Sequence, residues 1–119
     1  MTAASTAAQI TEDYERAWMS GDVDKAMSYV AEDIVCEAPT GTLAGAPAYR
    51  KFLADFVEIL TGATITKVFG DDTSAAVVYS TDTTFVQGIR VVDYATVENG
   101  KITHVTTVFD RLPLSQARR

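Results

Sequence analysis

Two different spacings of hydrophobic residues divide the chain into a first and a second half. In the first half, apolar side chains recur every three or four positions, which is the spacing of helices that bury one face. Ile10, Tyr14 and Trp18 form the first such row, a shorter row lies within 23–30, and a strong row lies within 49–60. In the second half, β-branched and aromatic residues predict four strands. These strands span residues 63–69, 75–86, 89–97 and 101–110.

Glycine, proline and polar residues mark the ends of these elements. Gly21 suits the left-handed end of the first helix, and Asp22 can cap the second helix. Pro47 suits the first turn of the third helix, because its fixed φ is already helical. Asn99-Gly100 predicts a tight hairpin, since both residues tolerate positive φ. Between the second and third helices, residues 34–37 predict a brief strand that ends before a proline and a glycine.

The resulting order, α-α-β-α-β-β-β-β, predicts an α+β fold with three helices packed in a curved, mostly antiparallel sheet. The 119 residues suffice for one domain over 1–119, which we expect to end in a short tail at 112–119. The apolar space between helices and sheet commonly binds a hydrophobic small molecule. Because the outer sheet face carries further Val, Tyr and Phe residues, we expect a homodimer through that face.

The charge and hydropathy of the chain argue against some partners. The formal net charge is -6, and the acidic residues are spread along the chain. Because phosphate binding needs clustered Lys and Arg, we expect neither a nucleic-acid partner nor an anionic membrane partner. No apolar run reaches the roughly 20 residues that span a bilayer. The first ten residues also lack the basic and apolar blocks of a signal peptide, so we expect a cytoplasmic location.

The chain has one cysteine, Cys36, and one histidine, His104. A single cysteine cannot form an internal disulfide. One His, one Cys and scattered acids match no metal-ligand spacing, so we expect neither a metal nor another cofactor. Strand alternation turns His104 toward the outer face, where a surface or interface role is expected. Cys36 follows apolar strand residues and is expected to be a buried, inert thiol.

Two segments carry a resemblance to a known superfamily: AWMSGDVDKAMSYVAEDIVCEAPTG and the hairpin VVDYATVENGKITHVTTVFDRL. They resemble the NTF2-like superfamily, and within it the SnoaL-like polyketide cyclases and ketosteroid isomerases. The resemblance covers nearly the whole chain and implies a cone-shaped, cystatin-like α+β fold. It also implies an enzyme that acts without a cofactor on a hydrophobic, carbonyl-bearing metabolite. Because the superfamily includes non-catalytic modules, fold alone does not select the function.

The resemblance implies roles for individual residues. Tyr14 lies seven residues before Gly21, where ketosteroid isomerases have their oxyanion-hole tyrosine. Asp93 matches their second oxyanion donor, a carboxylic acid that an apolar site keeps protonated. Both donors would face the oxygen of a developing enolate. The position of their general base is occupied by Ala38, and the adjacent Glu37 should face the other side of the strand.

The strand predicted at 75–86 offers Asp82 as a candidate replacement for that base. Aligned with limonene epoxide hydrolases, Asp82 falls where that branch has a charged pocket residue. Strand alternation places Asp82 on the face opposite Tyr79, and the pattern alone favours the face of Tyr79 for the core. Asp82 can therefore serve in the pocket only if both sheet faces are covered; otherwise it is an exposed or interface residue.

The remaining pocket walls are expected from the helices and the last strand. Trp18 lies one turn after Tyr14 and suits a flat ligand, although core packing explains it equally well. Alternation in the last strand groups several side chains with Asp93. The residues expected to line the pocket are Trp18, Ala38, Phe52, Phe56, Val105, Thr107 and Phe109.

Three functions remain open from the sequence. The first is an isomerase or polyketide cyclase in which Tyr14 and Asp93 stabilise an oxyanion and Asp82 or water acts as base. The second is a dimeric binding or accessory module that kept the pocket and lost catalysis, which Ala38 favours. The third is an epoxide hydrolase or epoxide-opening cyclase, which requires Asp82 and Asp93 to share one cavity.

Overall fold

The computed structural model describes residues 6–110 and residue 112. The expected tail at 112–119 lies outside the described residues apart from Leu112. The predicted order of elements is confirmed, with one short strand added between the first strand and the third helix. The elements are α1 (Ala7–Met19), α2 (Val23–Met27), β1 (Val30–Ala38), β2 (Gly41–Ala44), α3 (Ala46–Ile59), β3 (Leu60–Gly70), β4 (Ser74–Thr83), β5 (Ile89–Glu98) and β6 (Lys101–Phe109).

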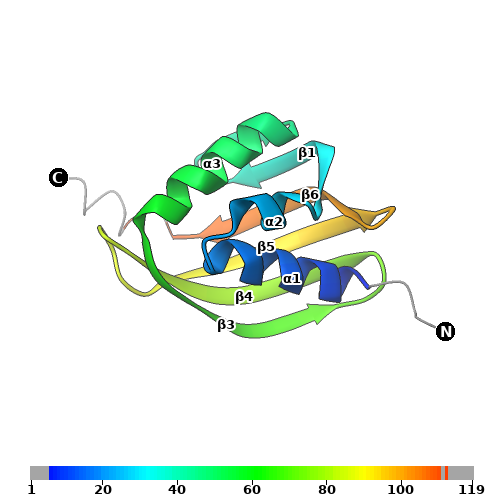
Figure 1. Ribbon diagram of the computed structural model, residues 1–119. Coiled ribbons are helices and arrows are strands. Elements are labelled where there is room, and N and C mark those ends of the chain that lie inside the picture. Colours follow the sequence, from blue (N-terminus) through cyan, green and yellow to red (C-terminus); the bar gives the residue numbers. More distant parts are fainter. Residues whose placement is uncertain (1–5, 111, 113–119) are drawn as a thin grey trace.

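The strands form one six-stranded sheet in the order β2-β1-β6-β5-β4-β3. All neighbours are antiparallel except β1 and β6, which pair in parallel, so the predicted mostly antiparallel sheet is confirmed. The three helices lie on one face of this curved sheet (Figure 1). The inner face is therefore covered by helices. Among the described residues, no helix has the length and hydrophobicity to cross a bilayer.

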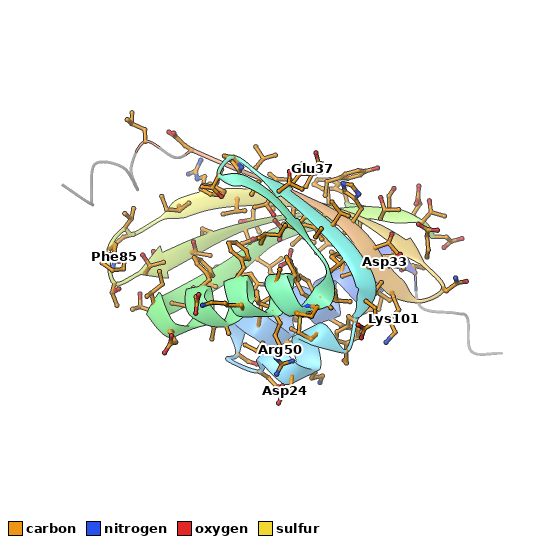
Figure 2. All side chains as sticks on the ribbon, turned by 90° about the horizontal axis from the view of Figure 1, so that it is seen from above. Asp24, Asp33, Glu37, Arg50, Phe85 and Lys101 are labelled. Carbon is orange, nitrogen blue, oxygen red and sulfur yellow. The ribbon has the colours of Figure 1, made fainter. Side chains whose placement is uncertain are left out.

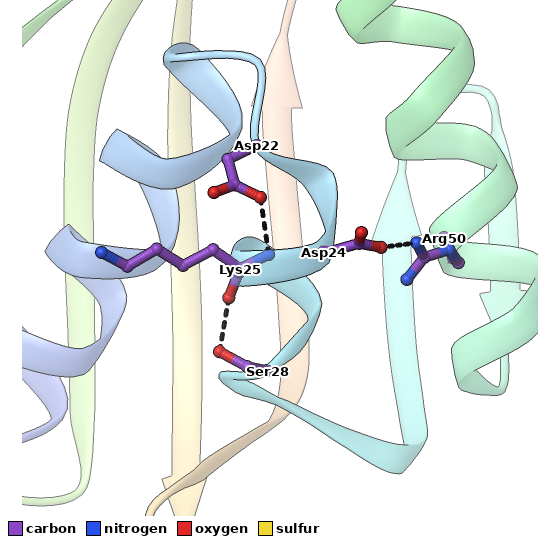
Figure 3. A network of polar contacts seen from close by, with 5 residues as sticks. All are labelled: Asp22, Asp24, Lys25, Ser28 and Arg50. Atoms are coloured by element: carbon purple, nitrogen blue, oxygen red, sulfur yellow. Dashed lines mark hydrogen bonds and ion pairs between the residues drawn. The ribbon is translucent and has the colours of Figure 1, made fainter.

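The ends of the helices follow the local chemistry of the sequence. Gly21 has a φ of 92° between α1 and α2, and the Asp22 side chain accepts a hydrogen bond from the backbone N–H of Lys25 at 3.0 Å. Figure 3 shows this cap together with the ion pair between Asp24 and Arg50. Since α2 has only five residues, the Asp24–Arg50 contact with α3 helps to hold α2 in place.

The hairpins agree with the sequence at one turn and differ at another. Asn99 and Gly100 both have positive φ, 52° and 77°, as a tight β5–β6 hairpin requires. The strand expected at 75–86 ends at Thr83 instead. The Thr83 hydroxyl accepts hydrogen bonds from the backbone N–H groups of Phe85 and Val86 at 3.2 and 3.1 Å. This local turn uses backbone groups that a longer strand would pair, so it ends β4.

The two faces of the sheet differ in their contact with water. In β4, burial alternates along the strand, and the inward side chains are those of Ala75, Val77, Tyr79, Thr81 and Thr83. Large apolar side chains remain exposed on the outer face. Phe69, Tyr94 and Val108 are 55%, 50% and 57% exposed, respectively. Figure 2 shows Glu37 on the opposite side of the molecule from Asp24 and Arg50.

Candidate functional site

A cavity of about 250 Å³ lies between the helices and the inner face of the sheet. Helices α1 and α3 contribute most of its apolar wall and the hydroxyl groups of Tyr14 and Tyr49, and β4, β5 and β6 contribute most of its other polar residues. The lining consists of Tyr14, Trp18, Thr40, Tyr49, Phe52, Leu53, Phe56, Ile59, Tyr79, Thr81, Thr83, Ile89, Val91, Asp93, Thr107 and Phe109. A larger and more open hollow, of about 420 Å³, lies beside Arg16 and Ile65. No buried acid lines that hollow, so the enclosed cavity is the better candidate site.

Asp93 is the one acid among the described lining residues of the cavity. It is only 4% exposed, and both of its carboxyl oxygens accept hydrogen bonds. Oδ2 accepts from the Tyr79 hydroxyl at 2.9 Å, and Oδ1 accepts from the Thr107 hydroxyl at 2.8 Å. These two donors, from the strands on either side of β5, fix the orientation of the Asp93 carboxyl group.

Glu15 lies behind Asp93, in α1, and is fully buried. Its Oε1 accepts a hydrogen bond from the indole N–H of Trp18 at 2.7 Å, and Oε2 accepts none from a described residue. Burial, and next the negative charge of Asp93, raise the pKa of Glu15 well above its ordinary value. Burial also raises the pKa of Asp93, while the interaction with Glu15 and the hydrogen bonds from Thr107 and Tyr79 oppose that rise.

Two tyrosine hydroxyls meet in the wall of the same cavity. The hydroxyl groups of Tyr14 and Tyr49 form a hydrogen bond between α1 and α3. Burial, followed by nearby acidic groups, raises the pKa of both phenols well above 10.0, so both stay protonated at neutral pH. The pair carries two hydroxyl hydrogens and uses one between the two oxygens. The second hydrogen can be donated to a ligand oxygen.

Comparison with known proteins identifies the family. A family model described as a SnoaL-like domain matches residues 11–105. The chain belongs to this SnoaL-like family. It is 42% identical to a protein of known structure from Kribbella flavida DSM 17836, with a TM-score of 0.92 over 95% of this chain and 93% of that one. No curated protein sequence matches the chain.

Two more distant structures show the fold alone. An NTF2-like protein of unknown function from Cytophaga hutchinsonii ATCC 33406 is 18% identical, with a TM-score of 0.84 over 97% of this chain and 99% of that one. An LEH-like epoxide hydrolase from M. tuberculosis is 17% identical, with a TM-score of 0.75 over 93% and 87%. The expected NTF2-like fold and SnoaL-like resemblance are therefore confirmed. The family includes isomerases, cyclases and epoxide hydrolases.

The structure brings most of the sequence-predicted pocket residues of this SnoaL-like domain to one cavity. The lining includes Tyr14, Trp18, Phe52, Phe56, Asp93, Thr107 and Phe109. Phe52 is 40% exposed, which places it toward the mouth. Val105 is buried in the hydrophobic core, and Ala38 is partly buried near the end of β1. Neither Val105 nor Ala38 belongs to the lining.

Asp82 differs from its expected position. Thr81 and Thr83 point into the cavity, so alternation turns the intervening Asp82 to the other face of β4. Its Oδ1 accepts a hydrogen bond from the backbone N–H of Gly88 at 2.7 Å. Asp82, a candidate catalytic residue from the sequence, therefore does not line the cavity of Asp93, which the epoxide-opening alternative required. Helices cover only the inner face, so the hydrophobic pattern was a better guide than the alignment to a distant branch.

Three polar residues of the site were missed by the sequence reasoning, and each had a signal. Glu15 lies on the same helical row as Thr11 and Trp18, where a charged side chain is unusual. Tyr79 lies on the face of β4 that the pattern assigned to the core. Tyr49 lies on the apolar stripe of α3 and was interpreted only as packing.

The other candidate residues lie outside the cavity. His104 is on the outer face, where its Nε2 lies 2.7 Å from Oε2 of Glu37. Cys36 is buried, and burial raises the pKa of its thiol to about 11, so it stays protonated at neutral pH. Within residues 6–110 and 112, no three His, Cys, Asp or Glu side chains are grouped as ligands for a metal ion.

Proposed function

We propose that the chain is a cofactor-free enzyme that acts on an uncharged, hydrophobic carbonyl compound, with chemistry of the isomerase or polyketide cyclase type. One observation carries the proposal. The carboxyl group of Asp93 and the hydroxyl pair of Tyr14 and Tyr49 line the same buried, mainly apolar cavity. A fixed proton acceptor and a neutral hydrogen-bond donor are the two groups that enolisation needs.

The proposed step is a proton transfer to Asp93. The Asp93 carboxylate takes a proton from the carbon beside the carbonyl of the ligand, and the electron pair of that C–H bond forms the enolate. A hydroxyl hydrogen of the Tyr14–Tyr49 pair stabilises the enolate oxygen. Return of the proton from Asp93 to another carbon completes an isomerisation. In a cyclisation, the enolate carbon instead attacks a second carbonyl of the ligand, and the resulting alkoxide oxygen takes the proton back from Asp93.

This role for Asp93 differs from the donor role that the resemblance suggested. Both Asp93 oxygens accept hydrogen bonds, from Tyr79 and Thr107. Such an arrangement stabilises a carboxylate and not a neutral acid. Asp93 also supplies the general base that Ala38 and Asp82 do not, since neither of these two residues lines the cavity.

The cavity also limits the chemical class of the ligand. None of the described lining residues is Lys, Arg or His, so the cavity has no partner for an anionic ligand. Its volume of about 250 Å³ is below the roughly 300–1,000 Å³ of drug-sized sites, which favours a compact ligand of one or two rings. The aromatic side chains of Trp18 and Phe56 suit flat ring faces.

A non-catalytic binding module is the second candidate function. It is favoured by the lining, in which Asp93 is the one acid among the described residues. It is also favoured by the resemblance to ketosteroid isomerases, which matches Ala38 to the position of their general base. The epoxide-opening alternative depended on Asp82 and Asp93 sharing the cavity. Because they face opposite sides of the sheet, we do not propose it.

The experiment that separates the two functions measures binding and proton exchange together. Neutral cyclic ketones and 1,3-diketones are titrated against the fluorescence of Trp18, the single tryptophan, which lines the cavity. The same compounds are incubated with the protein in D₂O, and deuterium at the carbon beside the carbonyl is followed by NMR. Binding with accelerated exchange supports the enzyme. Binding without exchange supports the binding module and contradicts the enzyme.

We also propose a homodimer through the outer sheet face. The exposed side chains of Phe69, Tyr94 and Val108 support it, because apolar groups on one sheet face are typical of an interface. Analytical ultracentrifugation of the wild type and of Tyr94→Glu tests it. A dimer that the substitution converts to a folded monomer is expected. A wild-type monomer throughout the micromolar range contradicts the proposal.

A further inference from the structure

The buried acid pair has no basic partner in the part of the chain that the structure describes. Glu15 from α1 is 0% exposed and Asp93 from β5 is 4% exposed. Helix α1, which carries Glu15, packs against β5, which carries Asp93. After burial, the negative charge of Asp93 is the next cause that raises the pKa of Glu15. Neither forms an ion pair with a Lys, Arg or His among the described residues. Two adjacent negative charges without a cation are too costly to bury, so the pair must keep a proton.

The hydrogen bonds around the pair distinguish its two members. Asp93 accepts one hydrogen bond on each oxygen, from Tyr79 and Thr107. Glu15 accepts one, on Oε1, from Trp18, and its Oε2 accepts none from a described residue. The negative charge is therefore better stabilised on Asp93. If Oε2 of Glu15 carries the proton, this otherwise unpartnered atom can donate a hydrogen bond to the Asp93 carboxylate.

We propose that Glu15 is a positioning residue that holds the single proton of the pair on Oε2 and donates it to Asp93, so that Asp93 faces the cavity as the charged member. Glu15 does not line the cavity, so it would act through Asp93 and not on a ligand directly. This inference rests on the proposed function for its catalytic meaning. The position of the proton on Glu15 does not depend on the proposed function.

The other titratable groups that face the pair do not compete for the charge. They are Tyr14 from α1, Tyr49 from α3, Tyr79 from β4 and Cys36 from β1. Burial raises the pKa of each of these four groups, so all are neutral near pH 7. The pair is therefore expected to lose its protons in two steps, with the singly protonated form between them.

The direct test uses the wild-type protein labelled with ¹³C at its side-chain carboxyl carbons. Near neutral pH, the Glu15 carbon is expected at the chemical shift of a protonated acid and the Asp93 carbon at that of a carboxylate. Glu15→Gln and Asp93→Asn serve to assign the two signals. Reversed assignments, or two ionised carboxyl groups at neutral pH, would overturn the proposal.

A second readout uses Trp18, whose indole N–H donates to Glu15. As the pH rises, the Trp18 fluorescence of the wild type is expected to change when the acid pair loses its last proton. Glu15→Gln keeps a neutral hydrogen-bond donor that cannot ionise, so this change should be absent in the variant. Glu15→Gln should also keep the exchange activity within several-fold while Glu15→Leu lowers it tenfold or more. A titration of Trp18 that is identical in wild type and Glu15→Gln contradicts the proposal.

These readouts separate two kinds of failure. If the ¹³C shifts show the single proton on Glu15 but no ketone undergoes exchange, the proposed function fails and the position of the proton stands. If exchange occurs but Glu15 is ionised at neutral pH, the inference about Glu15 fails and the proposed function stands.

Discussion

Asp82 and Asp93 lie on neighbouring strands, β4 and β5, and face opposite sides of the sheet. Asp82 is partly buried and accepts a hydrogen bond from the Gly88 backbone in a turn. Asp93 is 4% exposed, lies beside a second acid, and is held by two hydroxyl groups. The sequence offers the same side chain at both positions. The helices covering one face of the sheet determine which acid keeps an ordinary environment and which can serve a buried reaction.

The largest expected difference between the two faces comes from placing a charge on each. Val77 is fully buried on the inner face, and Val108 is 57% exposed on the outer face. Val77→Asp should lower the free energy of unfolding by about 3–5 kcal/mol, because it buries an unpaired charge. Val108→Asp should change it by less than about 1 kcal/mol. Urea unfolding followed by Trp18 fluorescence checks both, and equal losses would show that the outer face is also covered.

The next effect concerns the hydroxyl groups of adjacent residues in β6. Thr107 donates to Asp93, whereas Thr106 precedes it on the opposite face of the strand. Thr107→Val should cost about 1.5–3 kcal/mol of stability, as for a hydrogen bond to a charged group. It should also raise the pKa of Asp93. The acidic limb of the pH–activity profile should therefore shift to higher pH. Thr106→Val is the control, and similar pH profiles for both variants would contradict this assignment.

The pH dependence of stability should show the raised pKa of Glu15. A folded-state pKa above the unfolded value of about 4.5 gives a stabilisation that is complete below pH 4.5 and is lost as pH rises through the folded pKa. Glu15→Gln cannot ionise and should lack this loss. Thermal unfolding from pH 4 to 9 in wild type and variant measures the difference. Parallel curves for the two proteins would mean that the Glu15 pKa is not raised.

The smallest effect is expected at the exposed acid–base pair of the outer face. His104 and Glu37 lie 2.7 Å apart with side chains 42% and 54% exposed. Solvent screens such a pair, so Glu37→Gln should change stability by no more than about 1 kcal/mol, and added salt should remove the difference. A larger, salt-insensitive loss would indicate that a second subunit covers this part of the sheet.

The sequence predicted the features that depend on local chemistry. Helical rows such as Ile10, Tyr14 and Trp18, the cap at Asp22, and the hairpin at Asn99-Gly100 were all identified because neighbouring residues determine them. Strand alternation also grouped Asp93 with Thr107. The family resemblance added the fold, which the comparisons confirm.

The features that were missed depend on contacts between distant segments. The early end of β4 at Thr83 follows from a hydroxyl that bonds two backbone N–H groups, which spacing alone does not reveal. Glu15 was not considered from the sequence, because its role follows from the packing of α1 against β5, which buries it. Asp82 was kept as a candidate because an alignment to a distant branch was weighed against the hydrophobic pattern, which favoured the other face of the strand for the core.

The central claim is that Asp93 carries out proton transfer and Asp82 does not. The most direct measurement is deuterium exchange into a bound cyclic ketone in D₂O, compared between Asp93→Asn and Asp82→Asn. Loss of a general base typically costs about 10²–10⁴-fold in rate, so Asp93→Asn should lose that much while still binding the ketone. Asp82→Asn should retain the wild-type rate within about twofold. Equal rates in Asp93→Asn and wild type, or a large loss in Asp82→Asn, would contradict the account.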